Sequence, residues 1–320
     1  MTFFRRRSRD RSVPPAVDPA CGNETLALML RQAEAGDWPA LCAGLAAVED
    51  PSELTWLVAG VSNVAGTEEG LAKAVADRPD SALPLLLSGA RQISWAWEAR
   101  TRARSQHVSQ EQWRVFGERL EVAEQQLFEV AEREPDWLAP WYFLQISGRG
   151  ASLDKEAGRI RFEAALRRCP GHLDSHRQRL QQLCAKWGGS HQQMHAFARE
   201  SMLAAPPGSP LGELVVLGHL ERWLDLPSGA DHSYLTSPDV LAELHEALGR
   251  SILHPDYVRP AGWQSAYNTF AMVFALVGEK WTARQLFEAI GPTVTESPWH
   301  YLSGDDPAKT FTALRERCAK

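Results

Sequence analysis

Four histidines and two cysteines between residues 169 and 195 are the side chains best suited to chemistry. His172 and His176 are four residues apart, and His191 and His195 repeat that spacing. Side chains four residues apart share one face of a helix, so two antiparallel helices could bring the two pairs together. Imidazole and thiolate are preferred zinc ligands. The spacing therefore makes these four histidines candidate metal ligands.

The spacing of this group does not match a known zinc motif. The chain contains neither Cys-x-x-Cys nor His-Glu-x-x-His. His172 falls in the cap region of an expected helix, and the repeat register described below places His176 between helices. We therefore predict no metal and no cofactor, with the histidines satisfied inside the fold. An enzyme or metal-dependent protein that uses these histidines is the alternative.

Other catalytic motifs are also missing from the sequence. There is no Gly-x-Ser-x-Gly, no Gly-x-x-x-x-Gly-Lys-Ser/Thr and no Gly-x-Gly-x-x-Gly. Asp231, His232 and Ser233 are the residue types of a hydrolase triad, but triads are assembled across a fold and not from adjacent residues. The motifs favour a non-catalytic protein, and dispersed catalytic residues would be needed for an enzyme.

The composition argues against nucleic-acid and membrane partners. The 320 residues carry a net charge of −6, with an isoelectric point near 6.0, whereas binding to nucleic acids or anionic lipids needs a basic surface. The longest apolar run, 270–277, is far shorter than the roughly 20 residues that span a bilayer. No apolar segment follows the arginines near the start, and the five cysteines are scattered, so we expect a cytoplasmic protein with reduced thiols.

The chain divides into four segments by composition and periodicity. Residues 1–20 are rich in Arg, Ser and Pro, which predicts a disordered basic tail. Residues 21–134 form an N-terminal helical region, with Asn23 as a helix cap and Ser109 starting a capping box with Gln112. Repeats follow in 135–295, and a capping segment in 296–320 ends the chain.

Proline punctuates the chain at a regular interval. Pro135, Pro170 and Pro206 precede expected helices at intervals of 35 and 36 residues. Small and bulky apolar residues fall at matching offsets before the first two prolines: Ala123, Leu127 and Val130, then Gly158, Phe162 and Ala165. A period in this range is typical of stacked helix pairs. The sequence thus predicts an all-α solenoid of antiparallel helix pairs.

These units resemble the tetratricopeptide repeat, whose helix pair is close to this length. Trp141 and Leu144 fit the first helix of the unit after Pro135, whereas His176 and Arg179 replace the expected Trp and Leu in the next unit. The last unit fits best, with Tyr267, Phe270, Ala271, Phe274, Ala283, Phe287 and Ile290 at family positions.

A second resemblance centres on the turn Trp187-Gly188-Gly189-Ser190. Together with Met194, Phe197, Arg199 and the upstream segment 95–100, it is similar to a bacterial family of tetratricopeptide-like proteins. That likeness extends over about residues 80–225 and implies no known activity.

The tetratricopeptide resemblance implies an interaction or scaffold module that binds a protein or peptide on its concave face. The Lys and Asn pairs with which some members clamp a terminal carboxylate are missing. Open solenoid ends and many tryptophans also allow a homo-oligomer as a third interpretation. The positions expected to contact a partner are Tyr142, Ile146, Arg177, Gln181 and Asn268.

Overall fold

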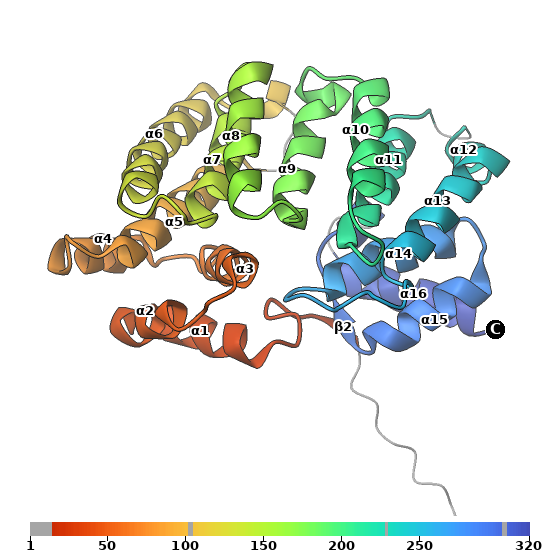
Figure 1. Cartoon of the computed structure of the whole chain (residues 1–320), viewed down its shortest axis with the longest axis horizontal. Helices are drawn as coiled ribbons and strands as arrows, with labels where there is room; N and C mark the ends of the chain where they lie inside the picture. The colour runs from red at the N-terminus through yellow and green to blue at the C-terminus, as the bar shows by residue number, and fades with distance from the viewer. Residues whose placement is uncertain (1–14, 102–104, 228–229, 303–305) are drawn as a thin grey trace, which may run out of the picture.

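The computed structural model describes residues 15–101, 105–227, 230–302 and 306–320. Within these ranges sixteen α-helices and four short 3₁₀ helices account for nearly all regular structure, and two strands have two residues each (Figure 1). The expected all-α, solenoid-like class is confirmed.

The helices up to the middle of the chain are α1 (Glu24–Glu34), α2 (Trp38–Ala46), α3 (Pro51–Val61), α4 (Glu68–Asp77), α5 (Ala82–Arg100), α6 (Gln110–Arg133), α7 (Ala139–Gly150) and α8 (Lys155–Arg168). Those that follow are α9 (Leu173–Leu183), α10 (His191–Ala204), α11 (Glu213–Leu224), α12 (Asp231–Leu235), α13 (Pro238–Arg250), α14 (Gln264–Leu276), α15 (Lys280–Ile290) and α16 (Pro307–Ala319). The 3₁₀ helices are η1 (Ser105–His107), η2 (Ala185–Trp187), η3 (Pro210–Gly212) and η4 (Trp299–Tyr301).

Local sequence signals set the helix boundaries. The Asn23 side chain accepts a hydrogen bond from the Leu26 amide, as predicted for a cap. Ser109 and Gln112 form the predicted capping box at the start of α6. Helix α6 ends at Arg133, just before Pro135, because a proline disfavours helical geometry in the residue before it.

Alternate helices form the inner layer of the solenoid. Helices α5, α7, α9, α11 and α14 contact one another in that order, and the helices that follow them in the chain form the outer layer (Figure 1). Each inner helix therefore packs against its own partner and against the next unit, as expected for stacked helix pairs.

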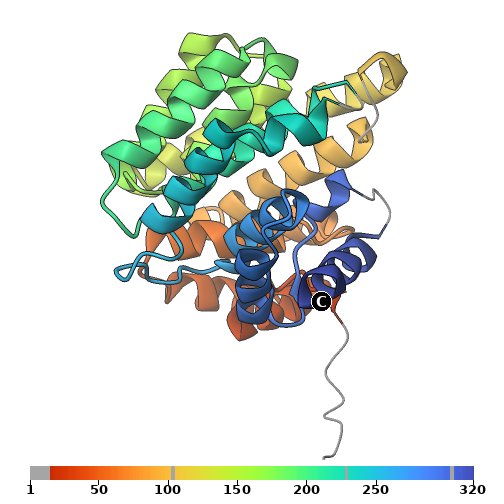
Figure 2. The ribbon, with the colours of Figure 1, turned by 90° about the vertical axis from the view of Figure 1, so that its right-hand side faces the viewer.

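The solenoid curves until its two ends meet. Strand β1 (Ala16–Val17) pairs in parallel with β2 (Thr293–Val294), and the Asp18 amide donates to the Val294 carbonyl at 3.2 Å. Helix α16 also packs against both strands, and in Figure 2 the blue C-terminal helices lie in front of the red N-terminal ones. The molecule is therefore a closed ring of helices, whereas the sequence had suggested an open groove.

The prediction of a disordered tail over 1–20 is wrong for its last residues. Residues 1–14 lie outside the part of the chain that the structure describes, but 15–20 are held in place. The Asp18 carboxylate accepts hydrogen bonds from the amides of Ala20 and Gly22, at 2.9 and 2.6 Å. Two paired residues are too short to leave a periodic signal in the sequence.

Two apolar clusters form the core. The first reaches from Ala20 to Leu144 and includes buried side chains of α7, which also packs against α8 and α9. The second runs from Leu180 to Cys318. The predicted capping segment 296–320 contributes fully buried side chains to it, including Trp299 and Phe311.

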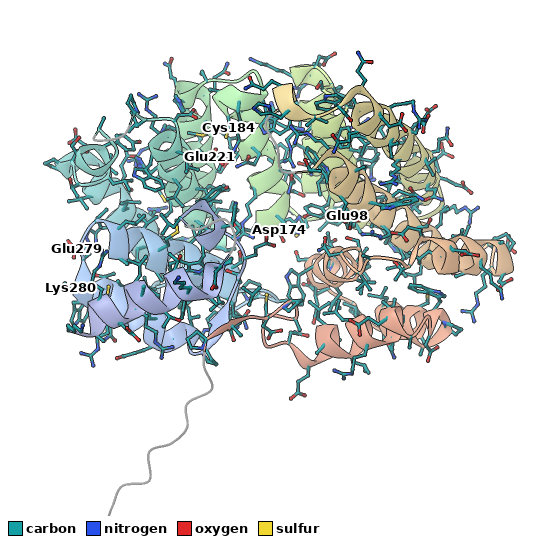
Figure 3. All side chains as sticks on the ribbon, turned by 180° about the vertical axis from the view of Figure 1, so that it is seen from behind. Glu98, Asp174, Cys184, Glu221, Glu279 and Lys280 are labelled. Atoms are coloured by element: carbon teal, nitrogen blue, oxygen red, sulfur yellow. The ribbon has the colours of Figure 1, made fainter. Side chains whose placement is uncertain are left out.

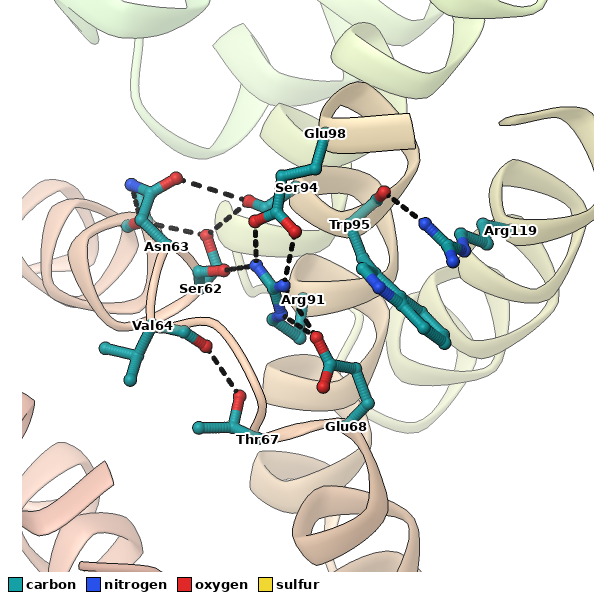
Figure 4. Close-up of polar contacts among 11 residues, drawn as sticks. Ser62, Asn63, Val64, Thr67, Glu68, Arg91, Ser94, Trp95, Glu98 and Arg119 are labelled. Atoms are coloured by element: carbon teal, nitrogen blue, oxygen red, sulfur yellow. Dashed lines mark hydrogen bonds and ion pairs between the residues drawn. The ribbon is translucent and has the colours of Figure 1, made fainter. Parts of the chain in front are cut away.

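A buried arginine connects α5 to α4 and to the end of α3. Arg91 on α5 is 1% exposed and donates to both carboxylate oxygens of Glu98, at 2.7 and 2.9 Å (Figure 4). It also donates to Glu68 on α4 and to the Ser62 carbonyl after α3. Burial alone would lower the pKa of Arg91, but Glu98 and Glu68 outweigh it and raise that pKa. The guanidinium is thus fully matched by the fold.

Candidate binding site

A cavity of about 670 Å³ lies where the ring closes. Distant parts of the chain line it, chiefly residues between Pro19 and Asn63, the beginnings of α7 and α9, and the stretch that leads into α14. A larger hollow of about 910 Å³ lies against α8 and α10, but its lining is mainly apolar. The first cavity, here called the central cavity, combines aromatic and charged side chains and is the better candidate.

Helix N-termini point carboxylates toward the central cavity. Helix α3 begins at Pro51, and Asp50 caps it by accepting from the Glu53 amide at 2.7 Å. Helix α9 begins at Leu173 and carries Asp174 in its first turn. The partial positive charge of a helix N-terminus stabilises acidic side chains, which accounts for acids at both positions.

Arg177, a predicted partner contact, lines the central cavity but is already engaged. Its guanidinium donates to Asp174 at 2.7 Å, to Glu213 on α11 and to the Ser265 hydroxyl on α14 at 3.2 Å. Glu213 is 1% exposed and also accepts from Thr269. Figure 3 places Asp174 toward the middle of the ring. Arg177 therefore ties three inner helices together.

The electrostatics of this group agree with a structural role. Burial alone would lower the pKa of the Arg177 guanidinium, but Glu213 and Asp174 outweigh it and raise that pKa. Burial would likewise raise the pKa of Asp174, and Arg177 more than offsets it, so the carboxylate is stabilised in its charged form.

Tyr142 also lines the central cavity, as part of a wall. Its side chain is 9% exposed, and its ring packs edge-on against Phe143 and His172 at centroid distances of 5.0 and 5.7 Å. Only a small part of the ring is open to a ligand. Replacing Tyr142 or Arg177 would therefore disturb the fold before it tested binding.

The other three predicted contacts do not line the cavity. Ile146 packs against the N-terminal apolar cluster, and Gln181 donates to Glu221 at 2.7 Å. Asn268 is fully buried and accepts from the Trp299 indole at 2.6 Å, so its predicted exposure is wrong. The C-terminal segment covers the face of α14 that an open tetratricopeptide groove would leave free.

Sequence reasoning missed four residues that face the central cavity: Glu53 and Trp56 on α3, and Arg259 and Trp263 before α14. The Arg259 guanidinium stacks on the Trp263 ring at 3.9 Å. Among the described residues, neither Glu53 nor Arg259 forms an ion pair. The only local sequence signal that could have pointed to these residues was the turn from Pro260 to Trp263, which an arginine precedes.

Gly262 lets the two sides of the ring touch. It has a φ of +71°, and a Cβ built on it would lie 2.3 Å from the indole nitrogen of Trp56. Only glycine fits this approach without displacing the neighbouring side chain. The contact closes the wall of the central cavity between α3 and the loop before α14.

The candidate metal ligands are distributed over separate sites. The His172 ring contacts the Ser175 hydroxyl at 2.8 Å, and the His176 ring packs on Phe162. His191 lies 3.1 Å from Asp225, and His195 packs on a different histidine, His219. In the described ranges no group of three or more His, Cys, Asp or Glu side chains could hold a metal ion.

Burial sets the charge of these histidines. It lowers the pKa of His172 and of His176, and it lowers that of His195 to about 4 with help from His219. All three are therefore neutral at pH 7. The Asp231-His232-Ser233 stretch lies at the start of α12, where the side chains of its first two residues fall outside the described part.

In comparisons with known proteins, no family model matches the chain, and no curated protein matches it either. Both family resemblances therefore stay predictions. No helix of the described ranges is long and apolar enough to cross a membrane.

Proposed function

We propose that this protein is a non-catalytic binding protein that holds a short peptide segment of a partner protein in its central cavity. The observation that carries the proposal is the pairing of aromatic walls with charges that have no ion-pair partner in the described structure. Glu53 projects from α3 and Arg259 from the loop before α14, and both line the same cavity.

The lining suits a peptide for physical reasons. Trp56, Tyr142 and Trp263 offer rigid aromatic surface, which supplies most of the affinity in many interfaces. Glu53 and Arg259 would orient the ligand through opposite charges. A volume of about 670 Å³ lies within the range of small-ligand sites, so a loop or chain terminus fits better than a whole helix.

A selection from a displayed library of short random peptides tests the proposal. We expect enrichment of peptides that combine one basic residue, one acidic residue and an apolar residue between them. Glu53→Gln and Arg259→Gln should each weaken binding of the selected peptides about tenfold, the effect of one charge-assisted hydrogen bond. Arg284→Gln is the matched control, since Arg284 pairs with Glu288 on the outer helix α15.

Exchanging the two charges sharpens this experiment. The double variant Glu53→Arg/Arg259→Glu should prefer peptides in which the basic and acidic residues have changed places. The proposal fails if no peptide is enriched on the wild type, or if the charge-exchanged variant and the wild type select the same sequences.

A further inference from the structure

A second cavity, of about 650 Å³, lies at the other end of α7 and α9. Whereas the central cavity meets the first turns of these helices, the second, here called the basic cavity, meets their last turns and the Trp187 turn. Its lining carries one carboxylate, from Asp154, and five basic side chains: Arg100, Arg149, Lys155, Arg179 and Lys186. This excess of positive charge stands out in a chain whose net charge is −6.

Three of these five basic side chains, Arg149, Lys155 and Arg179, have no ion-pair partner within the described residues. Asp154 is occupied as the cap of α8, accepting from the Ala157 amide at 2.8 Å. Lys186 forms an ion pair with Glu221 at 2.7 Å. Figure 3 shows Glu221 near Cys184. Arg179 donates only to neutral oxygens, on Gln182 and on the Lys155 backbone. Within the described residues, no carboxylate lies at ion-pair distance from Arg179, Lys155 or Arg149.

Arg149 is the most unusual of the five. Its guanidinium carbon lies 5.6 Å from the Trp97 ring and 5.5 Å from the Trp187 ring, and it donates to the Gln178 side chain. Its Nε atom is buried without a hydrogen-bond acceptor. Burial lowers the pKa of Arg149 to about 10, so the group stays charged at pH 7 at a cost in free energy.

Other largely buried arginines in this fold, which have a structural role, are neutralised by carboxylates. Arg91, Arg161 and Arg177 each contact at least one carboxylate, at Glu98, Glu124 and Glu213 among others. Arg149 has none. A half-buried cation that lies beside two tryptophans, with no carboxylate at ion-pair distance among the described residues, can accept an anion from outside.

We propose that the basic cavity binds a phosphorylated small molecule. Arg149, Lys155 and Arg179 would hold the phosphate, because guanidinium groups match phosphate oxygens in pairs and several cations suit a doubly charged group. The rings of Trp113 and Trp187, which also line the cavity, would pack on an attached ring or apolar part. A site of this kind is separate from the peptide site and can exist without it.

Calorimetric titration with three probes tests this assignment: inorganic pyrophosphate, adenosine monophosphate and adenosine. We expect the two phosphate compounds to bind the wild type, more weakly as salt is raised, and adenosine to bind at least tenfold more weakly. Arg149→Met and the double variant Lys155→Gln/Arg179→Gln should each lower phosphate affinity about tenfold or more. Arg159→Gln is the control, since Arg159 lies on α8 but pairs with Glu156 and Glu163 at the surface.

A thermal melt separates a ligand site from a purely structural role for Arg149. We expect the unliganded Arg149→Met protein to melt at or above the wild-type temperature and to lose the increase that pyrophosphate gives the wild type. The proposal is overturned if the wild type binds neither phosphate compound, if adenosine binds as well as its monophosphate, or if Arg149→Met melts lower yet keeps the ligand-induced increase.

Discussion

Two arginines at opposite ends of the inner helix layer differ in whether a carboxylate contacts them. Arg177, at the central cavity, contacts Asp174 and Glu213, and these two carboxylates neutralise its charge. Arg149, at the basic cavity, is desolvated beside Trp97 and Trp187, and no carboxylate of the described residues lies at ion-pair distance from it. Burial alone therefore does not distinguish a structural charge from a functional one. The presence or absence of an internal counter-ion does.

The two cavities differ in the same sense. At the central cavity, Glu53 and Arg259 form no ion pair within the described residues, whereas Arg177 is paired with Asp174 and Glu213. At the basic cavity the charges are nearly all of one sign. A ligand with both charges suits the first cavity and a polyanion suits the second.

The largest expected effect comes from removing the paired arginine. Arg177→Met should lower the free energy of unfolding by about 3–5 kcal/mol, because it leaves Glu213 buried and uncompensated. Arg149→Met should leave it unchanged or raise it, since an unpaired, half-buried charge is replaced by an apolar chain of similar size. Urea unfolding of both variants measures the difference. Equal losses would remove the distinction between the two arginines.

Much of the fold could be predicted from local signals. The prolines at 135 and 170, the Asn23 cap and the Ser109 capping box mark real helix boundaries because they act within one turn of the chain. The ring closure could not be predicted in this way. It depends on the summed curvature of many helix pairs and on a pairing of Ala16 with Thr293 that carries no periodic pattern.

The candidate site was only partly accessible to sequence reasoning. Repeat register placed Tyr142 and Arg177 on the inner face, where both indeed line the central cavity. It could not show that Glu213, 36 residues further on, neutralises Arg177. The repeat register also placed Asn268 on the partner-binding face. The register of one helix pair contains no information about the later segment, whose Trp299 covers Asn268.

The buried histidines, like the arginines, differ in whether they contact a carboxylate. This difference predicts a change of stability with pH that is smaller than the effect of Arg177→Met. His219 contacts the Tyr234 hydroxyl and Glu243 at 2.8 and 2.9 Å, whereas His195 packs on His219 and burial lowers its pKa to about 4. An unfolded histidine has a pKa near 6.5, so the unfolded state binds more protons between about pH 6.5 and 4. Stability should therefore fall as pH drops through this window.

Chemical unfolding at several pH values between 7 and 4 measures this loss. We expect His195 to account for about 1–3 kcal/mol of it, which is a discounted value because the ring is only partly buried. In His195→Phe the loss over this window should shrink by that amount. His245→Phe makes the same substitution at an exposed position and is the matched control. A wild-type slope retained in His195→Phe would contradict the assignment.

The smallest expected effect separates the two cavities from each other. Gly262→Ala forces a methyl group against Trp56, while Gly278→Ala introduces the same left-handed strain, at a φ of +85°, with no neighbour within 4 Å. Both variants should lose about 1 kcal/mol from strain, and Gly262→Ala should lose about 1 kcal/mol more from the clash. The extra loss measures how strongly the ring is closed at this contact.

Ligand binding to the same two variants completes the test. Because the Gly262 contact forms a wall of the central cavity only, Gly262→Ala should weaken the selected peptides several-fold and leave pyrophosphate binding at the basic cavity unchanged. Gly278→Ala should affect neither ligand. If Gly262→Ala weakened both ligands equally, the two cavities would be coupled through the ring, and the separation of a peptide site from a phosphate site would have to be abandoned.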